Sequence, residues 1–206
     1  MAVQLGAQGQ PDFNQPIELM MDCHRRIEHF LGVLGRVAER YQNTSLDSQG
    51  RVALETALNY FDLAAPRHTA DEEESLFPRM RQSSDVSVQE VMAKIDDLEA
   101  DHREAERAHE RLDKLGRQWF IDREIGGEHY HEFVAILKAL TNTYQAHIRV
   151  EDEQVFRAAG QLLNDAQLAE VGEEMRERRR MMPGREGSRC AQRRRESLQT
   201  DEAEHG

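Results

Sequence analysis

The sequence predicts an all-α protein, an up-down-up-down antiparallel four-helix bundle followed by a short C-terminal helix. Three observations support this class. Apolar side chains recur three and four residues apart over four long stretches, which is the spacing of one helix face. Short polar segments separate these stretches, and short connections make consecutive helices antiparallel neighbours. Only 38% of the 206 residues are hydrophobic, which disfavours a sheet covered on both faces.

The first helix is predicted over about residues 16–42, beginning at Pro16, a residue that suits a first turn. The turn after it offers Ser45 as the N-cap of the second helix. That second helix covers about residues 47–81 and contains Pro66. Because the proline ring removes one backbone donor and crowds the preceding turn, we expect a kink there.

The third helix is predicted from a capping box at residues 87–90 to about Phe120. Gly126 and Gly127 then break the chain, and the fourth helix follows them. A short charged helix is expected over about residues 164–179. No alternating strand pattern competes with these helices.

The chain thus divides into a flexible leader over residues 1–14, the bundle over 15–160, and a short helix with an Arg-rich disordered tail over 161–206. Residues 175–206 hold nine Arg and six acidic residues, a net charge of +3. Because the net charge of the whole chain is −12, residues 1–174 carry −15. An acidic body argues against nucleic-acid binding and fits a protein that collects cations, although solubility alone also explains it. The arginine clusters are interpreted as a solvated tail rather than a basic binding arm, because no aromatic residue interleaves them.

Several functional classes are excluded. No apolar run approaches the roughly 20 residues of a membrane span, and the N-terminal residues lack a secretory pattern, so we expect a cytoplasmic protein. Cys23 and Cys190 are too far apart for a disulfide scaffold or a Cys-ligated zinc site, and Cys23 is expected to pack in the core. No Ser-His-Asp arrangement or phosphate-binding glycine loop is present, and the oligomeric state stays open.

Polar residues interrupt every apolar stripe. Each stripe contains a histidine: His24, His68, His102 and His147. His68 and His147 are followed four residues later by a glutamate on the same face, Glu72 and Glu151, and Glu106 follows His102 at the same spacing. Four residues turn a helix by ~400° and raise it by ~6 Å, so both side chains of a pair project toward one point. Glu106 sits slightly off its stripe, and a surface pairing with Arg103 or Arg107 is its alternative. The candidate metal ligands are His24, His68, Glu72, His102, Glu106, His147 and Glu151.

The four histidines also share one level. At ~1.5 Å rise per residue they lie roughly 27, 31, 30 and 32 Å below the same end of the bundle. Burying unpaired carboxylates costs several kcal/mol each, so glutamates at this level need a cation or a partner. Imidazole plus carboxylate suits iron, manganese or zinc, and six or seven ligands suit two adjacent ions better than one tetrahedral zinc.

The second and fourth helices repeat one pattern. Residues 68–77 and 147–156 share a His, a Glu, a second Glu, an aliphatic residue and a Phe at offsets 0, 4, 6, 8 and 9. The two helices therefore present the same half-site, as a pseudo-twofold dinuclear centre requires.

These residues resemble the hemerythrin-like, or HHE cation-binding, domain family. The matching segments are DCHRRI at 22–27, HTADEEESLFP at 68–78, DH at 101–102 and HIRVE at 147–151. The resemblance implies a left-handed four-helix bundle that holds two non-haem iron ions (Fe2+/Fe3+), oxo- or hydroxo-bridged, with manganese or zinc as possible replacements. It also implies that Glu72 and Glu151 bridge the ions while the four histidines are terminal ligands.

The chain departs from the oxygen-carrying hemerythrins at two positions. Glu106 stands where they have a second histidine, and Glu151 stands where they have an aspartate. Additional carboxylate stabilises ferric iron, which favours redox reactivity, sensing or iron handling over reversible oxygen carriage. We therefore expect a di-iron protein that binds or reacts with O2, peroxide or NO. The alternatives are an iron-binding or iron-sensing module without turnover, and a metal-free structural bundle.

Two further seam residues have open roles. His109 rises ~10 Å beyond His102, so a position in the core or behind the ligands is favoured over direct ligation. Tyr144 lies one turn before His147 and is either plain core or a hydroxyl donor to a ligand at the metals. The remaining acidic residues of the two half-patterns are expected to face solvent: Glu73, Glu74, Asp152 and Glu153.

Overall fold

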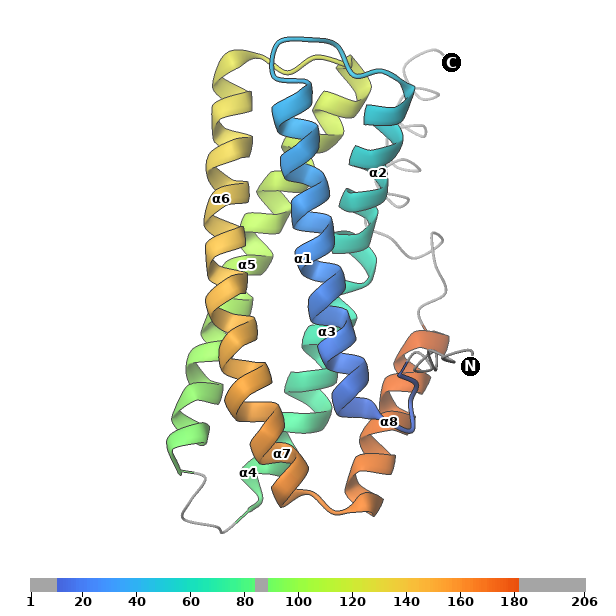
Figure 1. Cartoon of the computed structure of the whole chain (residues 1–206), viewed down its shortest axis with the longest axis vertical. Coiled ribbons are helices and arrows are strands. Elements are labelled where there is room, and N and C mark those ends of the chain that lie inside the picture. Colours follow the sequence, from blue (N-terminus) through green and yellow to red (C-terminus); the bar gives the residue numbers. More distant parts are fainter. Residues whose placement is uncertain (1–10, 84–88, 182–206) are drawn as a thin grey trace, which may run out of the picture.

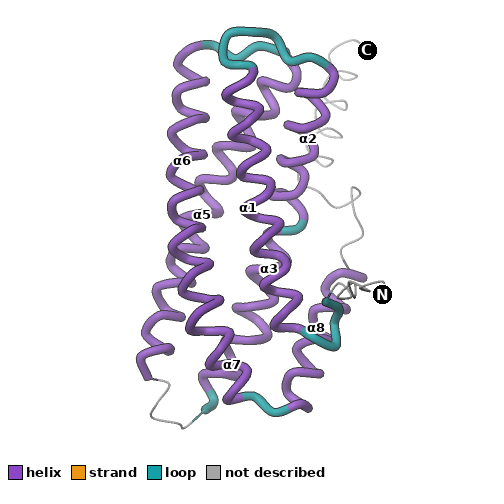
Figure 2. Tube along the Cα trace, in the orientation of Figure 1, coloured by secondary structure: helices purple, strands orange, loops and turns teal. Residues whose placement is uncertain are grey.

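The computed structural model describes residues 11–83 and 89–181, and every regular element within them is a helix (Figures 1 and 2). The predicted all-α class is therefore confirmed for this part of the chain. Most of the predicted leader, the start of the predicted capping box and the tail from residue 182 lie outside the described residues. No described helix is both long enough and apolar enough to cross a membrane.

By the bounds of their helices, residues 16–40, 48–81, 89–122 and 127–162 form four long rods, numbered here in chain order. The rods lie side by side, and consecutive rods run in opposite directions (Figure 1). The second and fourth rods are each composed of several segments. A further helix, α8, packs beside the first and second rods and is the short helix that the sequence predicted. In chain order the elements are α1 (Pro16–Arg40), α2 (Ser48–Leu63), α3 (Ala65–Ala70), η1 (Asp71–Leu76), α4 (Phe77–Arg81), α5 (Gln89–Asp122), α6 (Gly127–Val150), η3 (Glu151–Val155), α7 (Phe156–Leu162) and α8 (Asp165–Met181).

The cap of α2 differs from the prediction. Asp47, not Ser45, is the N-cap, and its Oδ1 accepts a hydrogen bond of 2.8 Å from the backbone N–H of Gly50. Tyr41 donates a second hydrogen bond of 2.6 Å to the same oxygen. Ser45 instead donates to Glu124 across the loop. The predicted N-cap was wrong because Ser45 lies too far before the first helical residue for its hydroxyl to reach the exposed N–H groups.

The predicted disruption at Pro66 is confirmed as a break between α2 and α3. The first segment ends at Leu63, and the second begins at Ala65 with Pro66 in its first turn. Proline has no N–H to continue the helical ladder, and its fixed φ suits a new first turn. The backbone N–H of His68 then bonds to the carbonyl of Ala64 at 3.2 Å, which restarts the helix.

Two π-helical segments, which the sequence pattern did not predict, lie at matching places in the second and fourth rods. In η1 the N–H of Phe77 bonds to the carbonyl of Glu72, and in η3 the N–H of Phe156 bonds to the carbonyl of Glu151. Each bond spans five residues rather than four, which is the π-helical connection. Single π turns inside α-helices often mark functional sites, and each of these contains one of the predicted bridging glutamates.

Two apolar clusters of buried side chains flank the middle of the rods. The larger includes Ile27 and Trp119, and the smaller includes Met20 and Phe77. Along α1, His24 falls between members of the two clusters, and the other rods repeat this order. The four predicted histidine ligands, with Glu72 and Glu151, therefore occupy a polar layer between two apolar cores.

The contact between α8 and the segment before α1 gives a first prediction. A Cβ added at Gly172 would lie 1.9 Å from the backbone oxygen of Phe13, whereas one added at Gly35 would meet nothing within 4 Å. We expect Gly172→Ala to lower the free energy of unfolding by roughly 1–3 kcal/mol. Gly35→Ala should leave it unchanged or raise it by up to about 1 kcal/mol. Urea denaturation of both variants measures this, and equal stabilities would contradict the packing of α8.

Candidate metal centre

The structure brings six of the seven predicted ligands together in the middle of the rods. They come from all four rods, and both glutamates are fully buried. The histidines are 1–5% exposed except His102, whose side chain is 8% exposed. The six are His24, His68, Glu72, His102, His147 and Glu151.

The first ligand group contains His24, His68 and both glutamates, with one ligand atom of each within 4.8 Å of the others. The Nε2 atom of His68 lies 3.3 Å from Oε1 of Glu72. The Nε2 atom of His24 lies 3.6 Å from that oxygen and 3.1 Å from Oε2 of Glu151. These atoms surround a space of the size that one metal ion requires.

The second ligand group contains His102, His147 and Glu151. The Nε2 atom of His147 lies 3.1 Å from Oε1 of Glu151, and Nε2 of His102 lies 3.5 Å from Oε2 of Glu72. Each carboxylate therefore directs one oxygen toward each pair of histidines. Both carboxylates therefore lie between the two pairs of histidines.

Several buried polar atoms in this layer lack hydrogen-bond partners in the described residues. Both carboxylate oxygens of Glu72, both of Glu151 and Nε2 of His24 are buried without one. Leaving buried carboxylates unsatisfied costs several kcal/mol each, whereas metal coordination would satisfy all five atoms. The donor set therefore fits a metal, and imidazole with carboxylate suits iron, manganese or zinc.

The electrostatics of the layer show the same demand for positive charge. Burial, together with repulsion from Glu151, raises the pKa of Glu72 to about 7. Burial lowers the pKa of His24, but Asp152, Glu151 and Glu72 outweigh it and raise that pKa to about 12. Burial also raises the pKa of Glu151, but the imidazoles of His147 and His24 hold it below its usual range. Without a metal, protons on these groups must balance the carboxylate charge.

Carboxylates behind the ligands orient three of the imidazoles. Asp152 lies 2.7 Å from Nδ1 of His24, and Glu73 lies 2.8 Å from Nδ1 of His102. Asp101 lies 3.4 Å from Nδ1 of His147. A carboxylate at Nδ1 holds the proton there and leaves Nε2 free to bind a metal.

The expectation that Glu73 and Asp152 face solvent was therefore wrong. Each directly follows a predicted bridging glutamate and reaches the histidine of a neighbouring rod, Glu73 from η1 to α5 and Asp152 from η3 to α1. The sequence held a signal for this, because an acidic residue occurs at offset 5 in both half-patterns. The solvated interpretation failed because these positions point between rods rather than away from them.

The pseudo-twofold relation between the half-sites is incomplete at one imidazole. Nδ1 of His68 is buried and has no hydrogen-bond partner in the described residues. Asp101, which serves His147, directly precedes His102, and the residue that directly precedes His24 is Cys23. Cys23 is buried, as expected, and its thiol is free. It therefore supplies no carboxylate to the first ligand group.

Glu106 is the one predicted ligand that the structure does not bring into the layer. It is exposed on α5 and belongs to neither ligand group. In the sequence Glu106 already lies slightly off the apolar stripe of its helix. Because α5 stays α-helical through this region, no local change of pitch turns Glu106 toward the layer. His109, one turn further along, also lies outside both groups, and its Nε2 is 3.0 Å from the hydroxyl of Tyr144.

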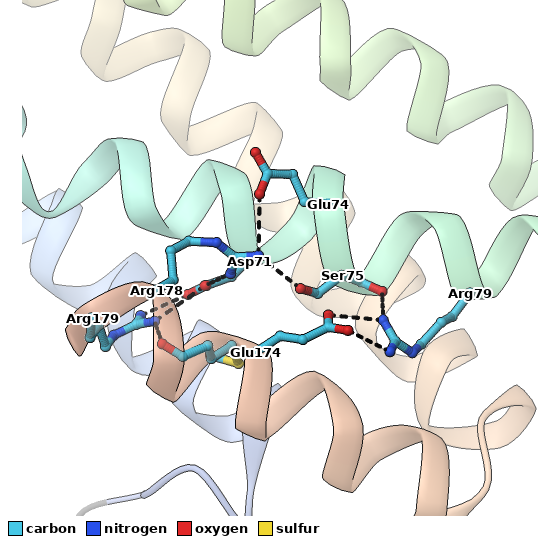
Figure 3. A network of polar contacts seen from close by, with 8 residues as sticks. Asp71, Glu74, Ser75, Arg79, Glu174, Arg178 and Arg179 are labelled. Carbon is cyan, nitrogen blue, oxygen red and sulfur yellow. Dashed lines mark hydrogen bonds and ion pairs between the residues drawn. The ribbon is translucent and has the colours of Figure 1, made fainter. Parts of the chain in front are cut away.

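The outer side of η1 is held by α8 (Figure 3). Asp71 is fully buried beside Glu72, and both Arg178 and Arg179 donate to its carboxylate, Arg179 Nη2 at 2.7 Å. Arg178 also donates to the hydroxyl of Ser75 at 3.0 Å. These arginines were assigned to a solvated tail from the sequence, and that was wrong, because the buried Asp71 requires cationic partners.

The outer carboxylates give a second prediction. Asp152→Asn should weaken metal binding about 10- to 100-fold, because an amide cannot hold the proton of His24 Nδ1 as a carboxylate does. Glu153→Gln is the matched control, since Glu153 is exposed on the same segment and should change the affinity little. Competition with a chelator under anaerobic conditions measures both dissociation constants. Equal affinities of the two variants would contradict the role of Asp152.

Comparison with known proteins agrees with this site. An uncharacterized protein of Haemophilus influenzae (strain ATCC 51907 / DSM 11121 / KW20 / Rd) is 27% identical over 169 residues, which cover 82% of this chain and 92% of that protein. Residues 15–159 match the hemerythrin HHE cation binding domain. This match spans all six clustered ligands and most of the described chain. The protein therefore belongs to the hemerythrin HHE cation-binding family.

Proposed function

We propose that the protein is a non-haem di-iron protein that binds or reacts with O2, peroxide or NO. The observation that carries this is the placement of the carboxylates, since Glu72 and Glu151 each direct one oxygen toward each histidine pair. One ion alone would leave two of these four buried oxygens unsatisfied. The family match to a cation-binding domain supports the same conclusion.

The residues of the chain have separable tasks in this proposal. His24 and His68 would hold one ion, and His102 and His147 the other, with the carboxylates shared. Two histidines and two carboxylate oxygens leave coordination positions open on each ion for a small ligand. Iron there would supply one-electron redox chemistry, and the apolar clusters border the layer on both sides.

The donor set and the number of ligands favour iron or manganese over zinc. Mixed imidazole and carboxylate ligands in a helical bundle are typical of di-iron and di-manganese sites, and a tetrahedral zinc needs only four ligands. The two carboxylate bridges would also stabilise the ferric state. Redox reactivity is therefore proposed ahead of reversible oxygen carriage.

A second candidate function, iron binding or iron sensing without turnover, is favoured by one contact. Asp71 directly precedes Glu72 and is held by Arg178 and Arg179 of α8. Binding or loss of a metal ion at Glu72 would therefore shift η1 and, through Asp71, change the contact with α8. In that case iron would order the protein and alter how α8 is held, with no chemistry on a small molecule.

Anaerobic loading with Fe(II) followed by air tests the proposal. We expect two irons per chain and a ferric absorption in the near-ultraviolet and visible range. Addition of peroxide or NO to the iron-loaded protein should then change this absorption spectrum within minutes. Fewer than one iron per chain and a flat spectrum would contradict the di-iron proposal. Two irons, a large fall in Tm on chelation and no response to peroxide or NO would select the sensing function.

Glu72→Gln distinguishes a metal site from a purely structural layer. Without metal we expect this variant to be more stable than the wild type by roughly 1–3 kcal/mol, because it removes one of two adjacent buried carboxylates. With metal we expect it to be less stable, because a bridge is lost. Glu74→Gln is the control, since that side chain is 69% exposed. Thermal unfolding with and without chelator measures the difference, and a shift of the same sign in both states would argue for the metal-free bundle.

A further inference from the structure

A cavity of about 880 Å3 between the second rod and α5 reaches the second ligand group. Its lining includes His102 and Glu73, together with His109 and Tyr144. Its volume is many times the roughly 30 Å3 that one water occupies in the liquid. The cavity therefore offers a route from solvent to His102 of the second ligand group.

His109 and Tyr144, which both line this cavity, form a hydrogen-bonded pair next to the polar layer. Nε2 of His109 lies 3.0 Å from the hydroxyl of Tyr144, and the ring of Phe61 stacks on His109 at 4.5 Å between centroids. The ring of Tyr144 lies 6.4 Å from that of His147. The phenol is thus held in place by an imidazole partner and by an aromatic wall, one turn from a predicted ligand.

The pair exists on one half of the pseudo-twofold centre alone. His109 follows His102 by seven residues, and the corresponding residue after His24 is Leu31. Tyr144 precedes His147 by three residues, and the corresponding residue before His68 is Ala65, so both counterparts are apolar. Leu31 and Ala65 are buried at 4% and 7% exposure. A hydroxyl donor is therefore built beside the second ligand group and is missing at the corresponding position of the first.

A second cavity, of about 570 Å3, lies between α1 and α6, and Tyr144 lines this one as well. Tyr144 therefore borders two spaces, one lined by the second rod and α5 and the other by α1 and α6. Thr141 lines the second cavity, and Thr69 lines the first. These two threonines allow the two routes to be closed independently.

We propose that small anionic or peroxide-like ligands approach the centre through the cavity between the second rod and α5, bind on the His102–His147 side, and accept a hydrogen bond from Tyr144. His109 is a positioning residue that holds the phenol. This inference rests on the proposed di-iron function, and it makes the two metal positions unequal although their ligands are alike. The chemistry that Tyr144 recognises is a hydrogen-bond acceptor on a small ligand.

Azide binding to the iron-loaded, air-oxidised protein tests the hydrogen bond. The azide-to-iron absorption gives a dissociation constant without any turnover. We expect Tyr144→Phe to weaken azide binding about tenfold, because a hydroxyl donor to a charged ligand is lost. Tyr130→Phe is the matched control, since Tyr130 lies 14 residues earlier on the same helix, about 21 Å away, and should leave the affinity unchanged.

The role of His109 is tested with a double-mutant cycle. His109→Leu reproduces the residue found in the other half, and it should weaken azide binding in the wild type but have no further effect in Tyr144→Phe. Additive effects of the two substitutions would overturn the positioning role. Unchanged azide affinity in Tyr144→Phe, with two irons still bound, would overturn the inference and leave the proposed function intact. Failure of the wild type to bind two irons would overturn both.

Stopped-flow azide binding tests the route. Thr69→Trp should slow azide association at least tenfold, whereas Thr141→Trp should change it less than twofold. Should Thr69→Trp lose iron, Ala105→Phe, which also lines the first cavity, takes its place. Slower association in Thr141→Trp alone, or in neither variant, would overturn the proposed route.

Discussion

The structure depends on two carboxylates buried side by side at the middle of a helical protein. Glu72 and Glu151 have no exposed surface and no hydrogen-bond partner for any of their four oxygens in the described residues. Burial of that kind is stable only if positive charge is brought to the same place. The four histidines, the carboxylates behind them and the two π turns are all arranged around this requirement. Two metal ions would supply this positive charge more completely than protons on the histidines, because they would satisfy all four oxygens together.

The two halves of the centre are related by a pseudo-twofold repeat, but they differ at a few positions. The second and fourth rods repeat the ligand pattern, the π turn and the outer carboxylate. The symmetry fails at Cys23, which stands where Asp101 stands in the other half, and at Tyr144, which has an alanine as its counterpart. The contact from α8 to Asp71 also acts on the second rod alone. A symmetric pair of ions would therefore sit in an asymmetric protein, with small ligands admitted on one side and mechanical coupling on the other.

Much of the fold and of the site was predictable because a helix converts sequence spacing directly into distance. A constant rise per residue placed His24 and His102 at one level, and the offset of four placed Glu72 beside His68. Features that break regular spacing were not predictable. The π turns add a residue to a turn without any compositional signal, and solvent exposure was assigned to Glu73 from its charge although it reaches between rods. Contacts between distant segments, such as Arg178 with Asp71, depend on tertiary packing that periodicity does not encode.

The central claim is that Glu72 and Glu151 share a pair of metal ions. Anomalous diffraction at the iron edge, from crystals of protein purified from its native host, tests it most directly. The result expected is two peaks, one beside His68 and one beside His147, each within coordination distance of an oxygen from both glutamates. A single peak, or none between these side chains while their carboxylates bond only to protonated histidines, would contradict it.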